Sequence, residues 1–323
     1  MSATRPIRIA GWLLGILASI LLVVGFFPWG SLHGIVQSRV SERLGRSVTI
    51  GAMERADTFG FHPSVAIRDL RVPQAARAGS GDLARVRTVT VTFAVWPLLT
   101  GRFQPEGIVA DGVRLALVRD ANGRTNWSED RDGDGKGGRK DLTDLTICDA
   151  LVSYADAKRD RQVTLRLSAD PVNGVRGAGA GTVRGAPVRV ALVGPAVGAG
   201  PWPFRVRIDG GALAMRAAGT MDRALDTGAM TLDVTARAAD LKYIDAVIEA
   251  GLFETQPVTM RAHVRHDDDI WTITGLRGTI GRSDLAGRLT VAKVDGRSKI
   301  DGVLDSRRFA FDDLSSDRGR AAG

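Results

Sequence analysis

The chain has 323 residues, with 44 Lys and Arg against 36 Asp and Glu, which gives a formal net charge of +8. Hydrophobic residues make up 44% and charged residues 25%, the ordinary proportions of a globular chain. The only cysteine, Cys148, excludes an intrachain disulfide, and its strand-like neighbours predict a small buried residue. The basic residues are spread along the chain without a basic motif interleaved with aromatic residues, so we expect no nucleic-acid partner.

The first predicted element is a membrane-spanning helix over Ile9–Phe27. These nineteen residues include no charged residue, and at about 1.5 Å each they give about 28 Å, close to the hydrocarbon thickness of a bilayer. Trp12 and Trp29 lie near its ends, where aromatic rings prefer the membrane–water boundary. Arg5 and Arg8 precede the run, which predicts a cytoplasmic N-terminus and an exported body.

A cleaved secretory signal peptide and a buried core helix are the alternatives to this anchor. A signal peptide ends in a small-residue cleavage site, whereas this run ends in the bulky sequence GFFPWG. We therefore favour an uncleaved anchor. Its predicted side chains are Ile9, Trp12, Leu13, Leu14, Ile16, Leu17, Ile20, Leu21, Leu22, Val23, Val24, Phe26, Phe27 and Trp29.

Two short amphipathic helices are predicted after the anchor. The first covers Leu32–Leu44, where apolar residues recur at helical spacing and Gly45 can end the helix. The second covers about Leu241–Ala250, with Asp240 placed to cap it and Gly251 placed to end it. We expect the second helix to cover one end of a β-sheet.

The remainder of the chain is predicted to be mainly β, with many antiparallel strands joined as meanders. Apolar residues alternate with polar ones, and Gly, Asp, Asn and Pro turn signals separate the runs. Arginines that alternate with apolar residues, as in Phe204–Ile208 and Val188–Val190, are predicted to lie on the solvated face. Two short helices cannot cover so many strands, so the sheet closes as a sandwich or half-barrel, or stays open as an elongated apolar groove.

The domain organisation follows from these elements. Residues 1–28 form the cytoplasmic stub and anchor, 29–129 an N-terminal β module, 130–141 a Gly/Asp-rich linker, 142–314 a C-terminal β module and 315–323 a disordered tail.

The linker contains a weak calcium-loop candidate. Asp130, Asp132, Asp134 and Asp141 have the spacing of positions 1, 3, 5 and 12, and Gly135 is the sixth residue. A glycine replaces the usual apolar eighth residue, the last ligand is a short Asp, and no helices flank the loop. A solvated linker is therefore the favoured interpretation, and we expect no metal and no cofactor.

No constellation in the chain predicts catalysis. There is no G-x-S-x-G nucleophile elbow, and Gly177–Gly181 lacks the spacing of a dinucleotide-binding loop. We therefore expect a protein that is not an enzyme.

An ordered set of short motifs resembles the AsmA family of bacterial envelope proteins. The motifs are Leu44-Gly45-Arg46-x-Val48-x-Ile50, Pro63-Ser64, Asp69-Leu70-Arg71-Val72, Leu83-Ala84-Arg85-Val86, Leu98-Leu99-x-Gly101, Arg119-Asp120-Ala121-x-Gly123-Arg124-x-Asn126-Trp127, Gly281-x-Ser283-Asp284-Leu285-x-Gly287-x-Leu289 and Asp301-Gly302-x-Leu304-x-Ser306. Single motifs are weak, but their order behind an N-terminal apolar segment is more specific.

The resemblance implies a bacterial inner-membrane protein with one membrane pass, a periplasmic body and a role in outer-membrane assembly. The wider AsmA-like group, to which TamB and chorein-like lipid-transfer proteins are related, implies transfer of phospholipid along an apolar β groove. The lipid-face candidates are Val89, Val91, Phe93, Val95, Val113, Leu115 and Leu117. The alternative is a scaffold or regulator that binds envelope-assembly proteins and transports nothing.

Overall fold

The computed structural model describes residues 34, 37–38, 41–42, 46–56, 63–75, 81–94, 105–127, 145–224, 226–249, 251–268, 270–294 and 297–315. The predicted anchor Ile9–Phe27, the whole linker 130–141 with its flanks, and residues 316–323 of the predicted tail lie outside these ranges.

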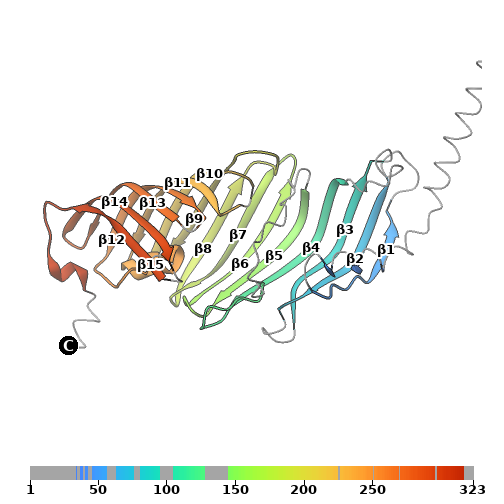
Figure 1. The fold of residues 1–323 in the computed structure, drawn as a ribbon, viewed down its shortest axis with the longest axis horizontal. Helices are drawn as coiled ribbons and strands as arrows, with labels where there is room; N and C mark the ends of the chain where they lie inside the picture. The colour runs from blue at the N-terminus through green and yellow to red at the C-terminus, as the bar shows by residue number, and fades with distance from the viewer. Residues whose placement is uncertain are drawn as a thin grey trace, which may run out of the picture.

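The described residues form one open sheet of 15 strands, and the strands follow their sequence order in space (Figure 1). The strands are β1 (Ala52–Arg55), β2 (Ser64–Pro73), β3 (Asp82–Phe93), β4 (Pro105–Arg119), β5 (Leu145–Asp156), β6 (Arg161–Asp170), β7 (Gly174–Val183), β8 (Ala186–Gly194), β9 (Trp202–Gly210), β10 (Leu213–Met221), β11 (Ala229–Ala238), β12 (Val258–Asp267), β13 (Ile270–Ile280), β14 (Ser283–Val294) and β15 (Arg297–Asp305). The prediction of an elongated, mainly antiparallel sheet is confirmed. The described strands do not divide into the two sheets of a sandwich.

One neighbouring pair is parallel, which corrects the prediction of antiparallel meanders throughout. Ile108 on β4 lies opposite Leu145 on β5, and Arg119 lies opposite Asp156. A parallel pair requires a crossover of roughly a dozen residues or more, and residues 120–144 provide a connection of that size. The pair joins strands of the two predicted β modules in one sheet, and the module boundaries stay a prediction.

The second predicted helix is observed as α4 (Leu241–Ile248). Asp240 caps its N-terminus as predicted, because Asp240 Oδ1 accepts a hydrogen bond of 2.7 Å from Lys242 N. The predicted apolar stripe is also confirmed: Leu241 and Ile244 are buried.

The end of α4 differs from the prediction. Glu249, not Gly251, is the C-cap, and its φ of 56° lies in the left-handed region. This conformation is held because Arg119 and Arg161 bind the Glu249 carboxylate. Gly251 N donates instead to Asp245 Oδ1 at 2.6 Å.

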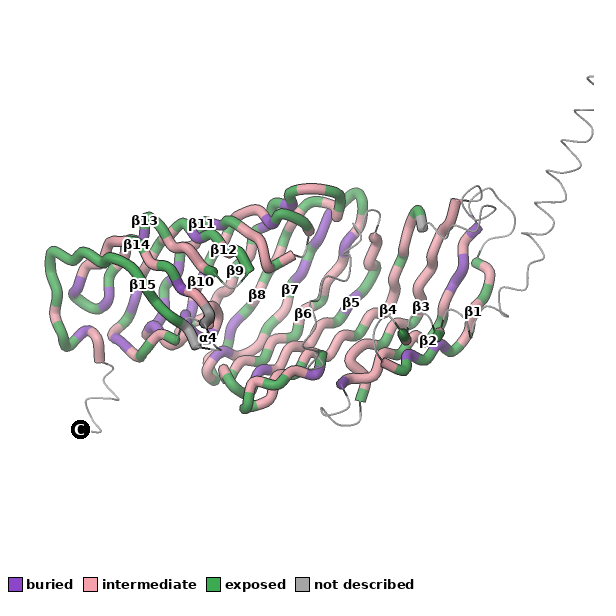
Figure 2. Tube along the Cα trace, viewed as in Figure 1, coloured by how far each residue is buried: buried purple, intermediate pink, exposed green. Residues whose placement is uncertain are grey.

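Two clusters of buried side chains form the core, and they lie mostly on β6–β14 (Figure 2). One cluster surrounds α4 and contains Val183, Val188, Leu213, Met215, Ala236, Ala238, Leu241, Ile244, Ala246, Val258 and Ile280. The other contains Ala169, Val175, Trp202, Phe204, Met221, Leu232 and Val264. The first cluster gathers residues from one end of its strands, so α4 covers that end of the sheet, as predicted.

The helix predicted over Leu32–Leu44 is described only in part. Gly34, Gln37, Ser38, Ser41 and Glu42 are helical. Across all the described ranges, no helix is both long enough and apolar enough to span a bilayer. A short 3-10 helix, η3 (Phe311–Leu314), follows β15.

Candidate functional site

One face of the sheet is apolar across most of the strands, because apolar residues on neighbouring strands are register partners. One row runs from Leu115 on β4 through Val152, Leu165, Gly179, Val190, Ile208, Met215, Ala236, Met260 and Gly278. A second row runs from Val113 through Ala150, Leu167, Gly177, Leu192, Val206, Ala217, Val234 and Ala262. Register partners project from the same side of a sheet. We call this side the apolar face.

An extra residue in β5 keeps its apolar side chains on the apolar face. Leu167 and Ala169 on β6 lie two residues apart and therefore share a face. Their partners on β5, Ala150 and Ile147, lie three residues apart. The additional residue is a β-bulge, and it reverses the alternation of the strand.

A different irregularity is aligned across β2, β3 and β4. Asp69 on β2 and Gly112 on β4 have φ values of 51° and 63°, and Arg87 on β3, between them, forms no ladder pair with either strand although the register is the same on both sides of it. A side chain is strained at positive φ, and a Cβ on Gly112 would lie 2.8 Å from Arg87 Cβ, so glycine is required there. The side of the sheet to which alternate residues point is exchanged at these positions, so Val89 and Val113 share the apolar face.

The predicted lipid-face residues are therefore brought together, with one exception. Val89, Val91 and Phe93 on β3 and Val113, Leu115 and Leu117 on β4 are all half-buried. Val95 lies outside the described residues. Sequence reasoning omitted their register partners Ile108 and Ala110 on β4 and Val152 on β5. The alternation of these residues with polar ones could have identified them. The change in the side to which alternate residues point, at the line of Asp69, Arg87 and Gly112, concealed this pattern.

The apolar face is covered to different degrees along the sheet. On β7–β13 the two core clusters bury residues near the two ends of the strands, while mid-strand residues such as Val190, Val206 and Ala217 are half-buried. On β3 and β4 every described apolar-face residue is half-buried, and neither cluster includes a residue of these strands. An apolar ligand can therefore reach the face on β3 and β4 without displacing a packed core.

The opposite face carries the basic side chains, as predicted. Arg189, Arg205 and Arg207 are exposed and alternate with buried or half-buried apolar residues on β8 and β9. Cys148 is also exposed, which corrects the prediction of a buried residue. It lies between Ile147 and Ala150 in the bulge of β5, and the irregular backbone turns it away from the apolar face.

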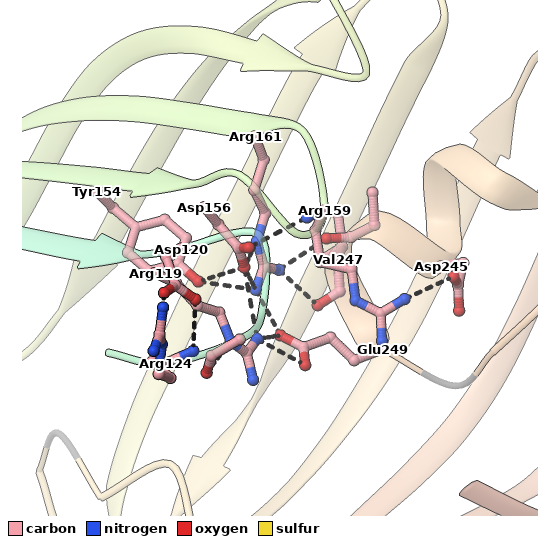
Figure 3. A network of polar contacts seen from close by, with 12 residues as sticks. Arg119, Asp120, Arg124, Tyr154, Asp156, Arg159, Arg161, Asp245, Val247 and Glu249 are labelled. Atoms are coloured by element: carbon pink, nitrogen blue, oxygen red, sulfur yellow. Dashed lines mark hydrogen bonds and ion pairs between the residues drawn. The ribbon is translucent and has the colours of Figure 1, made fainter. Parts of the chain in front are cut away.

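A network of ionic contacts lies where the ends of β4, β5 and β6 meet α4 (Figure 3). Its centre is Asp156, whose side chain is 0% exposed. Asp156 Oδ2 accepts hydrogen bonds from the Tyr154 hydroxyl at 2.9 Å and from Arg161 Nε at 3.1 Å. Arg119 Nη1 lies 3.4 Å from the same oxygen.

Glu249 connects this centre to the end of α4. Arg119 Nη1 donates to its two carboxylate oxygens at 2.9 and 3.0 Å, and Arg161 Nη2 donates to Oε1 at 2.5 Å. Arg161 Nη1 also donates to the carbonyl oxygen of Ala246 at 2.7 Å. Two arginines and two carboxylates thus join three strand ends to the helix. Sequence reasoning missed this set, because its members are up to 130 positions apart.

Electrostatics keep both carboxylates charged. Burial raises the pKa of Asp156, but the hydrogen bond from Tyr154 and the charge of Arg161 outweigh it, so the pKa is lowered. Burial likewise raises the pKa of Glu249, and its contacts with Arg119 and Arg161 lower it below the usual range. Burial raises the pKa of Tyr154. At neutral pH the two carboxylates are therefore charged and Tyr154 is neutral, and the network is a structural clamp.

Two motifs of the AsmA resemblance also meet in space. Asn126 is buried, and its side chain accepts a hydrogen bond from Val118 N and donates one to Ala116 O, each at 2.9 Å. Arg46 reaches the same turn, donating from Nη2 to Trp127 O at 2.8 Å. These residues hold the segment before β1 against the end of β4.

No metal site is found within the described residues: no three His, Cys, Asp or Glu side chains gather there. Asp130, Asp132, Asp134 and Asp141 lie outside those residues, so the calcium-loop interpretation stays a prediction.

Taken together, the fold defines an elongated one-sheet β protein with a single apolar face, closed at one end of its strands by a helix. The sequence model of the AsmA family matches residues 1–136. The predicted resemblance to the AsmA family is thus confirmed over this N-terminal part of the chain. No curated protein and no solved structure gave a significant match.

Proposed function

We propose that this protein binds phospholipid on the apolar face of β3–β6 and acts in the bacterial cell envelope. The observation that carries the proposal is the continuous apolar face, which is half-buried on β3 and β4 and which the two core clusters do not cover there. Acyl chains gain about 25 cal/mol for each Å² of apolar surface removed from water. No covalent step and no cofactor are needed, so the proposal is not an enzymatic one.

The dimensions of the face support a chain-like ligand. Apolar residues on β4 extend from Ile108 to Leu117, a distance of about 30 Å at 3.3 Å per residue. Across the strands, 15 strands at about 4.8 Å reach roughly 67 Å along the curved sheet. A long, narrow apolar surface fits acyl chains better than a compact metabolite, which is usually held in a concave pocket.

The proposal also includes the location. An anchor at Ile9–Phe27 would hold the N-terminal end of the sheet at the inner membrane with the body in the periplasm. AsmA-family membership is compatible with an envelope role.

Val91→Asp tests lipid binding directly. Val91 lies opposite Ile108 on the apolar face, and a carboxylate there should weaken lipid binding about tenfold, because it must be desolvated against acyl chains. The measurement is mass spectrometry of phospholipid extracted from full-length protein purified in mild detergent.

Thr90→Asp is the matched control for Val91→Asp. Thr90 is the adjacent residue of β3, is equally half-buried and points to the other face. It should leave the bound lipid unchanged, and both variants should melt at similar temperatures. Wild-type protein without lipid, or equal losses in the two variants, would contradict the proposal.

The core clusters of the C-terminal half favour a second candidate, a scaffold that binds envelope-assembly proteins. The strand ends that are packed into these clusters offer no open apolar surface to a ligand. A pulldown rich in assembly proteins from a wild-type protein that carries no lipid would support this candidate over lipid binding.

A further inference from the structure

The C-terminal edge of the sheet is long and apolar. β15 pairs only with β14, and its register is regular from Arg297 to Asp305. Ile300, Val303 and Leu304 are exposed by 45%, 49% and 48%. The opposite edge strand, β1, has only four residues. A long regular edge with exposed apolar side chains is a template for pairing with another strand.

The two sides of β15 differ in chemistry. Ile300, Gly302 and Leu304 alternate along one side, and their partners Val291, Leu289 and Gly287 place them on the apolar face. Lys299, Asp301, Val303 and Asp305 alternate along the other side. Lys299, Asp301 and Asp305 make no ion pair within the described part of the chain. Both sides of the edge therefore lack partners.

We propose that β15 pairs in antiparallel fashion with β15 of a second copy of this chain, around a two-fold axis at Gly302. In this register Ile300 lies opposite Leu304 of the second copy on the apolar face. Lys299 lies opposite Asp305 of the second copy on the other side. The two-fold axis repeats each pair, so the contact has two apolar pairs and two pairs of opposite charge.

Other registers are less favourable. A two-fold axis at Asp301 places the two copies of Asp301 opposite each other, and an axis at Val303 places Asp301 opposite Asp305. Both registers oppose like charges, which destabilises strand pairing. An axis at Ile300 places Lys299 opposite Asp301, but it leaves Leu304 and Asp305 beyond the paired strands. The charges and the strand length together favour the register centred on Gly302, and the charges discourage pairing with unrelated strands.

The centre of the contact suits glycine. A Cβ on Gly302 would lie 2.3 Å from Arg288 O and 2.7 Å from Leu289 Cδ2. Because Gly302 has no side chain, no side-chain atoms crowd the two-fold axis. Pairing would join two sheets of 15 strands with their apolar faces on the same side. This inference concerns assembly, goes beyond the proposed lipid binding and does not rest on it.

Charge exchange tests the register. Lys299→Glu opposes Asp305 of the second copy with a like charge, and Asp305→Lys opposes Lys299 in the same way. Each variant should weaken the dimer about tenfold, because two favourable pairs become two repulsive ones. The double variant Lys299→Glu/Asp305→Lys restores both pairs and should return the dissociation constant to about the wild-type value.

The measurement is sedimentation of full-length protein in mild detergent over a range of concentrations. Asp301→Lys is the control: Asp301 lies opposite Val303 of the second copy, so this variant should not weaken the dimer. All substituted side chains are exposed, and unchanged melting confirms folding. A wild-type protein that is monomeric throughout overturns the proposal. Equal dissociation constants for the single, double and wild-type proteins overturn it too, as does a different protein bound at this edge.

Discussion

At the scale of residues, the side chains with the strongest contacts are structural. Asn126 and Arg46 belong to motifs that first indicated the family, and both are used in hydrogen bonds to backbone atoms. Asp156 and Glu249 are used in ion pairs with two arginines. The polar residues thus position strands, and the apolar residues are left to form the surface proposed to bind ligand.

Removing the charge of Asp156 should destabilise the fold. Asp156→Asn leaves Arg119 and Arg161 without one of their two carboxylates, in a site where the Asp156 side chain is 0% exposed. Breaking a buried ion pair costs about 3 kcal/mol, and thermal or urea unfolding measures this loss. Glu54→Gln is the control, because the Glu54–Arg68 pair is more than half exposed and should contribute less than about 1 kcal/mol.

The lowered pKa values of Asp156 and Glu249 predict that the protein loses stability in acid. The folded-state pKa values of Asp156 and Glu249 lie below their unfolded values of 3.8 and 4.5. Their contribution is therefore complete above the unfolded pKa values and is lost as the pH falls through the folded ones. The melting temperature should fall between about pH 5 and pH 3. The melting temperature of the Asp156→Asn variant should fall less steeply over the same range. Parallel curves for the two proteins would contradict this assignment.

At the scale of elements, α4 and the bulge line decide where the apolar face is covered. The helix lies on one end of the strands and completes a buried cluster. The positive-φ positions Asp69 and Gly112 keep Val89 and Val113 on one face, and the bulge at Ile147–Ala150 does the same for β5. These elements thus form one continuous apolar face, which the core clusters cover in part on β7–β13 and do not cover on β3 and β4.

The N-cap of α4 gives a prediction at this scale. Asp240→Ala removes the hydrogen bond to Lys242 N and should cost about 1 kcal/mol in the free energy of unfolding. Asp240→Asn keeps a capping oxygen and should restore most of the stability. Urea unfolding compares the three proteins, and equal losses for both variants would show that the cap bond is not the cause.

At the scale of the whole molecule, the sheet and the predicted anchor are separable. The core clusters and the clamp contain no residue before Arg119, so a chain without residues 1–30 should fold with the same β content. Circular dichroism measures that content. The shortened chain should no longer sediment with membranes, whereas the full chain should. Loss of folding in the shortened chain would contradict this separation.

The sequence by itself determined the class of structure and the resemblance to the AsmA family. Local alternation predicted the strands, Asp240 predicted the start of α4, and ordered motifs such as Arg119–Trp127 indicated the AsmA family, since each signal lies within a short stretch. The alternating apolar runs that contain Val91 and Leu115 were each recognised for the same reason.

Only the tertiary structure decided which surfaces those strands share. The parallel pairing of β4 and β5, the bulge that exposes Cys148 and the pairing of Arg119 with Glu249 all join residues far apart in the chain or depend on strand register. Such pairings have no local signal, because they arise from packing between elements. For the same reason, the strand ends buried in the two core clusters and the face of β3 and β4 that these clusters do not cover became distinguishable only in three dimensions.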